Sequence, residues 1–127
     1  MTKESIFLLL AAAGLTPVAL SYGLMPQVSM SYLFEIDASS VNSSHIFRAI
    51  MGLYFGMVIF WVAGAYKRSL TLPALWSITV FMLGLAMGRA IGIVLDGVPH
   101  LLLVAYLVLE IGFGSVAYYL ASRFRAI

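Results

Sequence analysis

The sequence predicts an all-α integral membrane protein, a four-helix bundle whose consecutive helices run up and down. Hydrophobic residues make up 63% of the 127 positions and charged residues only 9%. A soluble domain carries about 25% charged residues, and a soluble chain this short could not bury so much apolar side chain. Four long apolar stretches and a one-sided distribution of basic residues complete the case. Lipid is therefore the expected solvent.

Four continuous apolar stretches each supply the roughly 20 helical residues that cross a hydrocarbon core. We expect spans at about Ser5–Leu24, His45–Ala65, Thr71–Leu95 and His100–Ser122. The runs do not alternate as the strands of a membrane barrel do. The first stretch is longer than the apolar region of a typical signal peptide, so we expect it to be retained. Residues 1–127 then form a single transmembrane domain.

Basic residues near the span ends predict the orientation of the bundle. With four spans, one side carries Lys3, Lys67, Arg68, Arg123 and Arg125. The connections on the other side carry Glu35, Asp37 and Asp96 and no basic residue between the spans. Because cytoplasmic loops are enriched in Lys and Arg, we expect both termini to be cytoplasmic.

Ionisable residues gather between the predicted outer boundary and the middle of the membrane. They are His45, Arg48, Arg89, Asp96, His100 and Glu110. At about 1.5 Å per residue, Arg89 lies roughly 9 Å and Glu110 roughly 16 Å below the outer surface. A lone charge at the bilayer centre costs about 2.5–3.5 kcal/mol, so such residues are expected to pair. Two interpretations stay open: a network that pins the bundle, or a polar pocket that opens outwards and holds an anionic or polar ligand.

Two further patterns concern packing and depth. Gly84, Gly88 and Gly92 form a doubled small-xxx-small stripe, which favours close helix packing either within the bundle or across an oligomer seam. An aromatic belt is predicted near the cytoplasmic span ends. Its members are Trp61, Tyr66, Trp76, Tyr118 and Tyr119.

Several function classes are not expected from this sequence. There is no cysteine, and the net charge of +2 is too small and scattered for a nucleic-acid surface. His45 and His100 do not form a paired metal-binding set, so no metal site is predicted. No serine has a recognisable nucleophile context, so no catalytic residue is predicted. We also expect no cofactor.

An ordered set of polar and glycine motifs runs along the chain: Arg48-x3-Gly52-x-Tyr54, Gly88-Arg89, Asp96-Gly97-x-Pro99 and Glu110. In these motifs the chain resembles a family of small four-span bacterial membrane proteins described only as a domain of unknown function. It is also distantly similar to DoxX-type proteins. The resemblance covers nearly the whole chain and implies a four-helix membrane fold and a bacterial source. It implies no reaction.

Three functional hypotheses follow. The first is a non-enzymatic protein of the bacterial inner membrane that serves as an accessory or assembly subunit of a larger membrane complex. An apolar chain this short offers a partner little besides helix surfaces. The alternative is a small binder or transporter whose Arg48, Arg89, Asp96 and Glu110 hold a ligand. A membrane enzyme acting on lipid or quinone is third.

Overall fold

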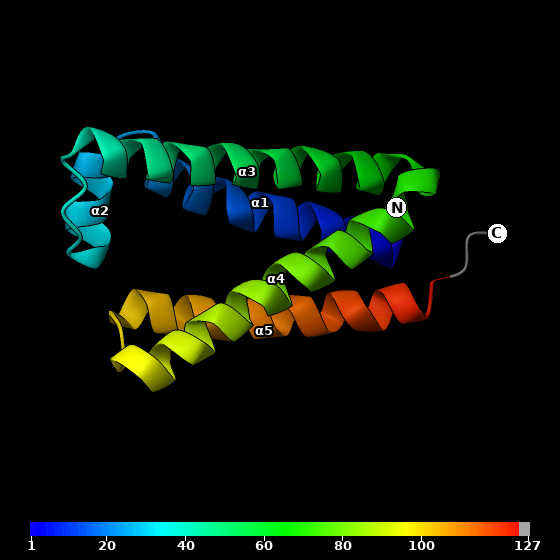
Figure 1. Ribbon diagram of the computed structural model, residues 1–127. Helices are drawn as coiled ribbons and strands as arrows, with labels where there is room; N and C mark the ends of the chain where they lie inside the picture. Colours follow the sequence, from blue (N-terminus) through cyan, green and yellow to red (C-terminus); the bar gives the residue numbers. More distant parts are fainter. Residues whose placement is uncertain (125–127) are drawn as a thin grey trace.

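The computed structural model describes residues 1–124, within which the chain forms five helices (Figure 1). They are α1 (Lys3–Gly23), α2 (Pro26–Phe34), α3 (Val41–Tyr66), α4 (Arg68–Asp96) and α5 (Leu101–Ser122). Four of them, α1, α3, α4 and α5, are long and apolar enough to cross a membrane. They run alternately up and down, which confirms the predicted all-α fold. Arg125, counted above among the basic residues, lies outside the described residues.

The long helices form two pairs that meet through α4. Helix α1 packs along α3, and α4 packs along α5. Helix α4 starts beside the end of α3 and crosses diagonally towards the start of α5 (Figure 1). One end of the bundle carries α2 and the α4–α5 connection, and we call it the α2 end. The opposite end carries the start of α1, the α3–α4 turn and the end of α5, and we call it the terminal end.

Helix α2 is an element that the sequence analysis did not predict, because it read this segment as a polar connection. Pro26 fits the first helical turn, where its missing N–H costs nothing. Met30 and Phe34 follow at four-residue spacing, and all three side chains are buried against the bundle. The helix ends at Phe34, and the capping residue Glu35 that follows has a left-handed φ of 59°. At nine residues, the helix is shorter than a span.

The loop between α2 and α3 is ordered by local hydrogen bonds. Ser39 donates from its hydroxyl and from its backbone N–H to Oδ1 of Asp37, at 2.7 and 3.1 Å. These two bonds lower the pKa of the Asp37 carboxyl. Ser40 then caps α3 by accepting a hydrogen bond from the Ser43 N–H. As a result, α3 begins four residues before the predicted start of the second span.

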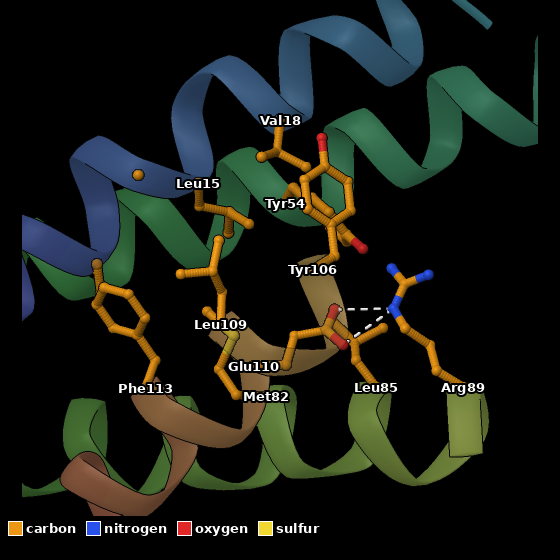
Figure 2. A pocket seen from close by; sticks show the side chains of 12 residues that line it. Leu15, Val18, Tyr54, Met82, Leu85, Arg89, Tyr106, Leu109, Glu110 and Phe113 are labelled. Carbon is orange, nitrogen blue, oxygen red and sulfur yellow. Dashed lines mark hydrogen bonds and ion pairs between the residues drawn. The ribbon is translucent and has the colours of Figure 1, made fainter. Parts of the chain in front are cut away.

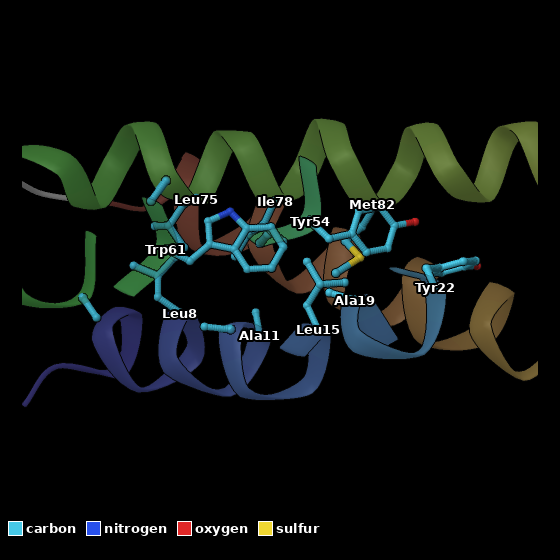
Figure 3. Close-up of a cluster of buried hydrophobic side chains, with 14 of the residues drawn as sticks. Leu8, Ala11, Leu15, Ala19, Tyr22, Tyr54, Trp61, Leu75, Ile78 and Met82 are labelled. Atoms are coloured by element: carbon cyan, nitrogen blue, oxygen red, sulfur yellow. The ribbon is translucent and has the colours of Figure 1, made fainter. Parts of the chain in front are cut away.

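The core lies between α1, α3 and α4, and Trp61 is its largest fully buried side chain (Figure 3). Leu8, Leu75 and Ile78 are also fully buried beside it. The Trp61 indole donates from Nε1 to the Ser77 hydroxyl at 2.9 Å. The prediction that Trp61 belongs to an interfacial belt is therefore wrong, because its N–H is satisfied by the protein and not at the headgroup level. The other four predicted members, Tyr66, Trp76, Tyr118 and Tyr119, are exposed.

Helix ends inside the bundle satisfy their free carbonyls through neighbouring side chains. At the terminal end, the Ser5 hydroxyl donates to the Ala65 carbonyl and the Thr71 hydroxyl to the Gly64 carbonyl, each at 2.7 Å. Both carbonyls belong to the last turn of α3, where no intrahelical partner is available. Such bonds matter in lipid, since no water is present there to replace them.

Within residues 1–124, the predicted small-residue stripe on α4 makes no close contact. A Cβ placed on Gly84, Gly88 or Gly92 would meet nothing within 4 Å. The close approaches occur elsewhere: a Cβ on Gly64 would lie 2.6 Å from Ala74 Cβ, and one on Gly114 would lie 2.6 Å from Leu83 Cδ2. Of the two interpretations of the stripe, packing within the bundle is therefore wrong for the described residues. The oligomer seam stays a prediction.

Candidate functional site

The most buried pair of opposite charges in the described chain joins α4 to α5. Arg89 precedes the end of α4 at Asp96 by seven residues, or about 10 Å of helix. Glu110 follows the start of α5 at Leu101 by nine residues, or about 14 Å. Nε of Arg89 donates to Oε1 and Oε2 of Glu110 at 2.9 and 3.1 Å. Their side chains are 20% and 8% exposed, so the two predicted intramembrane charges do pair.

A pocket of about 100 Å³ lies against this pair, between α1 and α3 on one side and α4 and α5 on the other (Figure 2). Four of its lining residues are polar: Tyr54, Arg89, Tyr106 and Glu110. The other eight are Ala11, Gly14, Leu15, Val18, Met82, Leu85, Leu109 and Phe113. The cavity is therefore apolar along most of its wall and polar at the end that faces the α2 end of the bundle.

The pocket opens sideways. Gly14 of α1 and Leu109 of α5 line it and are both exposed, with Leu109 at 55%. Both residues lie near the middle of their helices. In a bilayer this level is occupied by acyl chains, so the opening between α1 and α5 faces lipid.

Two tyrosines, Tyr54 and Tyr106, line the polar end of the pocket, and a third, Tyr22, packs against Tyr54. The Arg89 guanidinium carbon lies 5.7 Å from the centre of the Tyr106 ring, a cation–π distance. Tyr22 and Tyr54 pack edge to face, with ring centres 5.6 Å apart. Sequence analysis did not select these tyrosines as site residues, although Tyr54 belongs to the family motif.

Arg48 has a different role from the one predicted. Its Nη1 donates to the Gly23 and Leu24 carbonyls at 3.0 and 3.4 Å. These carbonyls end α1, so Arg48 caps that helix from α3. The residue is exposed and does not line the pocket.

The two histidines and Asp96 also lie apart from the pocket. His100 caps α5, where its Nδ1 accepts a hydrogen bond from the Leu102 N–H at 3.1 Å, and its ring contacts Phe34. Asp96 and His45 are exposed, and within residues 1–124 neither forms a hydrogen bond or an ion pair. The six predicted ionisable residues therefore do not form one network. Only Arg89 and Glu110 meet.

A second ion pair, which was not predicted from the sequence, lies at the terminal end of the bundle. Glu4, in the first turn of α1, is buried and lies 3.6 Å from Nη1 of Arg68. The Arg68 guanidinium also sits 4.4 Å from the centre of the Phe124 ring. The signal was available, since Glu4 and Arg68 both fall at predicted cytoplasmic ends. The pair ties α1 to the start of α4 at the terminal end.

The described residues offer no evident metal centre. Among residues 1–124, no three His, Cys, Asp or Glu side chains come together in a way that could hold a metal ion. The chemistry available at the pocket is hydrogen bonding from a guanidinium and from tyrosine hydroxyls beside a carboxylate.

Four apolar spans around a laterally open pocket define a multi-pass membrane protein with a cavity at the level of its spans. Residues 4–121 match the family described as domain of unknown function (DUF4345), and the chain belongs to that family. No curated protein and no solved structure matches the chain. The family description names no reaction, ligand or partner.

Proposed function

We propose that this chain is a non-enzymatic membrane protein that binds a lipid-soluble small molecule in the pocket between α1 and α5. The observation that carries the proposal is the shape and polarity of that cavity. It is apolar along its wall, open to lipid at Leu109, and ends on the Arg89–Glu110 pair. Ligand sites are typically apolar clefts with a few convergent polar groups.

The competing explanation is that Arg89 and Glu110 serve only to pin α4 to α5. Those two helices already pack along their lengths, so the pair is not needed to bring them together. A purely structural pair would also be expected to sit in a filled core, because buried polar groups are costly unless fully satisfied. Here the pair borders a cavity instead. The alternative hypothesis of a binder or transporter is thus favoured, with a mainly apolar pocket replacing the polar, outward-opening one.

Two adjacent residues on α5 allow a matched test of this proposal. Leu109 lines the pocket and Val108 does not, although their exposed fractions are similar at 55% and 65%. Protein purified in nanodiscs prepared from native lipid extract is examined by native mass spectrometry. The wild type and Val108→Trp should carry a reproducible small adduct, and Leu109→Trp should lose it. Equal adducts on all three proteins would show that the pocket is not the binding site.

The mass of the bound molecule tests whether the protein binds it without changing it. The molecule released from the wild-type protein should have the same mass before and after incubation with the protein. A time-dependent change of mass would make the chain an enzyme and would revive the hypothesis of chemistry on lipid or quinone.

An accessory role in a larger membrane complex is the second candidate. It is supported by the half of α4 nearer the α2 end, where a Cβ built on Gly84, Gly88 or Gly92 would meet nothing within 4 Å among residues 1–124. A shallow apolar groove lies beside it, lined by Met87, Ala90, Ile91, Val94 and Leu95. Stoichiometric co-purification of another membrane protein, lost on Gly88→Leu, would support this role. A wild-type protein that stays monomeric in its native membrane would contradict it.

We also propose that the terminal end of the bundle faces the cytoplasm of a bacterial cell. Lys3, Lys67 and Arg68 lie at that end, whereas Asp37 and Asp96 lie at the α2 end. The chain has no cysteine, so single substitutions can report the orientation. In intact cells a membrane-impermeant maleimide should label Ser39→Cys and not Ser69→Cys. The reverse pattern would invert the topology. We further propose a distant relationship to DoxX-type proteins, which the family match does not test.

A further inference from the structure

We infer that the pocket takes a neutral amphiphile with a single apolar tail and a hydrogen-bond-accepting oxygen in its head, and that the Nη atoms of Arg89 hold this oxygen. The inference rests on the proposed binding function and adds to it the chemical class of the ligand. Three properties of the site carry it: its charge balance, its remaining hydrogen-bond donors and its size.

The charges that line the pocket already balance. Arg89 and Glu110 are the two charged residues in the lining, and they neutralise each other at 2.9 Å. An anionic head placed at Arg89 would add a net negative charge beside the Glu110 carboxylate in a medium of low dielectric constant. Like charges in such a setting repel strongly. A neutral acceptor avoids this cost and still gains a hydrogen bond to a charged donor, which is stronger than a neutral one.

The remaining N–H donors of Arg89, on its two Nη atoms, point away from Glu110. The carboxylate is bonded through Nε alone, and Figure 2 shows the two Nη atoms turned away from it. A guanidinium has five N–H donors, and the one on Nε is used at Glu110. Nη donors are therefore left at the polar end of the pocket, where lipid cannot satisfy them.

The Tyr54 hydroxyl is a second donor at the polar end of the pocket. Tyr54 lines the pocket and is only 6% exposed. Within residues 1–124 its hydroxyl forms no hydrogen bond. A carbonyl oxygen that enters the polar end could accept from both Tyr54 and Arg89, which is the pattern expected of a site for an oxygen acceptor.

The size of the cavity limits the ligand to one narrow chain. Its volume of about 100 Å³ is smaller than the roughly 150 Å³ apolar cavity that accepts benzene in an engineered protein. Two acyl chains would not fit. The rest of a single tail can leave between Leu109 and Gly14, where a Cβ built on the glycine would meet nothing within 4 Å. Ligand therefore enters from the lipid with its head directed towards Arg89.

The test is equilibrium binding of tritiated methyl palmitate to the full chain in nanodiscs, with the Leu109→Trp protein as background. Unlabelled methyl palmitate, sodium palmitate at pH 9 and hexadecane serve as competitors. We expect methyl palmitate to compete about tenfold better than hexadecane, because a hydrogen bond to a charged group is worth about 1.5 kcal/mol or more. Palmitate should compete less well than the ester.

A neutral double variant, Arg89→Gln with Glu110→Gln, removes both charges of the pair and leaves no unpaired charge. It should keep binding displaceable by hexadecane and show a preference for the ester well below tenfold, because only neutral donors remain at the site. Equal competition by ester and hexadecane in the wild type would overturn the inference and leave the binding function standing. Stronger competition by palmitate would overturn the charge argument. Binding no greater than in Leu109→Trp would overturn the inference together with the proposed function.

Discussion

Arg89 and Glu110 join α4 to α5 through a single nitrogen: Nε lies 2.9 Å from one carboxylate oxygen and 3.1 Å from the other. This geometry differs from the side-by-side fork in which two guanidinium nitrogens face the two carboxylate oxygens. It leaves the outer edge of the guanidinium directed towards the polar end of the pocket (Figure 2). The pair therefore links the stability of the bundle to the chemistry of the cavity.

Removing the charge of Glu110 should destabilise the bundle. In Glu110→Gln the Arg89 charge stays in an apolar setting without its counter-charge, and we expect a loss of about 1–3 kcal/mol in the free energy of unfolding. Asp96→Asn is the matched control, because Asp96 is exposed and unbonded within residues 1–124. An SDS titration monitored by circular dichroism measures the free energy of unfolding of both variants. If the two variants lose the same stability, the buried pair contributes nothing particular to the fold.

Arg48→Gln should loosen the end of α1. The substitution removes the donor to the Gly23 and Leu24 carbonyls, with an expected local cost of about 1 kcal/mol. Hydrogen exchange of the amides around residues 20–30 should become faster, while exchange in α5 stays unchanged. His45→Gln, one turn earlier on α3, should leave both rates as they are. Unchanged exchange in Arg48→Gln would show that the cap is not formed in the membrane.

Gly64→Ala should destabilise the protein where Gly88→Ala does not. The new Cβ at residue 64 would lie 2.6 Å from Ala74 Cβ and 3.1 Å from the Leu70 carbonyl oxygen, so the helices must shift. Overpacking of this kind costs about 1–3 kcal/mol. At Gly88 the Cβ meets open space, and helix propensity alone would favour Ala. A comparable loss in Gly88→Ala, measured by the same SDS titration, would mean that the α4 stripe is covered in the membrane by something outside this chain.

The two tryptophans should report opposite environments. Trp61 is fully buried and Trp76 is 41% exposed. With brominated lipids, fluorescence of Trp61→Phe, which retains Trp76, should be strongly quenched. Fluorescence of Trp76→Phe, which retains Trp61, should be quenched several-fold less. Equal quenching would place Trp61 at the lipid surface and contradict the packing of α3 against α1 and α4.

The spans could be predicted because they depend on composition and length, which are properties of a stretch and not of a face. The depths of Arg89 and Glu110 followed from the same arithmetic, and these two residues do meet. The faces of the helices were harder to predict. In lipid both the buried and the exposed side of a span are apolar, so the sequence carries little periodic signal. Gly88 therefore looked like a packing position, while Gly64, which has no such motif, makes the close contact.

Hydrogen bonds from side chains to backbone atoms could not be predicted from the side-chain types alone. Arg48 satisfies the carbonyls of α1, and His100 satisfies an amide of α5. A sequence lists charges that could pair with each other, but it does not show helix ends that need a donor or an acceptor. The tyrosines at the pocket were missed for a related reason, since Tyr22, Tyr54 and Tyr106 converge only once three different helices are packed.

The most direct test of the binding function is an intermolecular nuclear Overhauser effect measured at the Met82 methyl group. Met82 lines the pocket and is only 7% exposed, so bulk lipid does not reach it. In protein with ¹³C-labelled methionine methyl groups, reconstituted in nanodiscs of deuterated lipid with protonated methyl palmitate added, the Met82 methyl should show a cross-peak to the ligand, and this peak should vanish in Leu109→Trp. Cross-peaks confined to Met87, which faces the lipid at 67% exposure, with none at Met82, would contradict binding in this cavity.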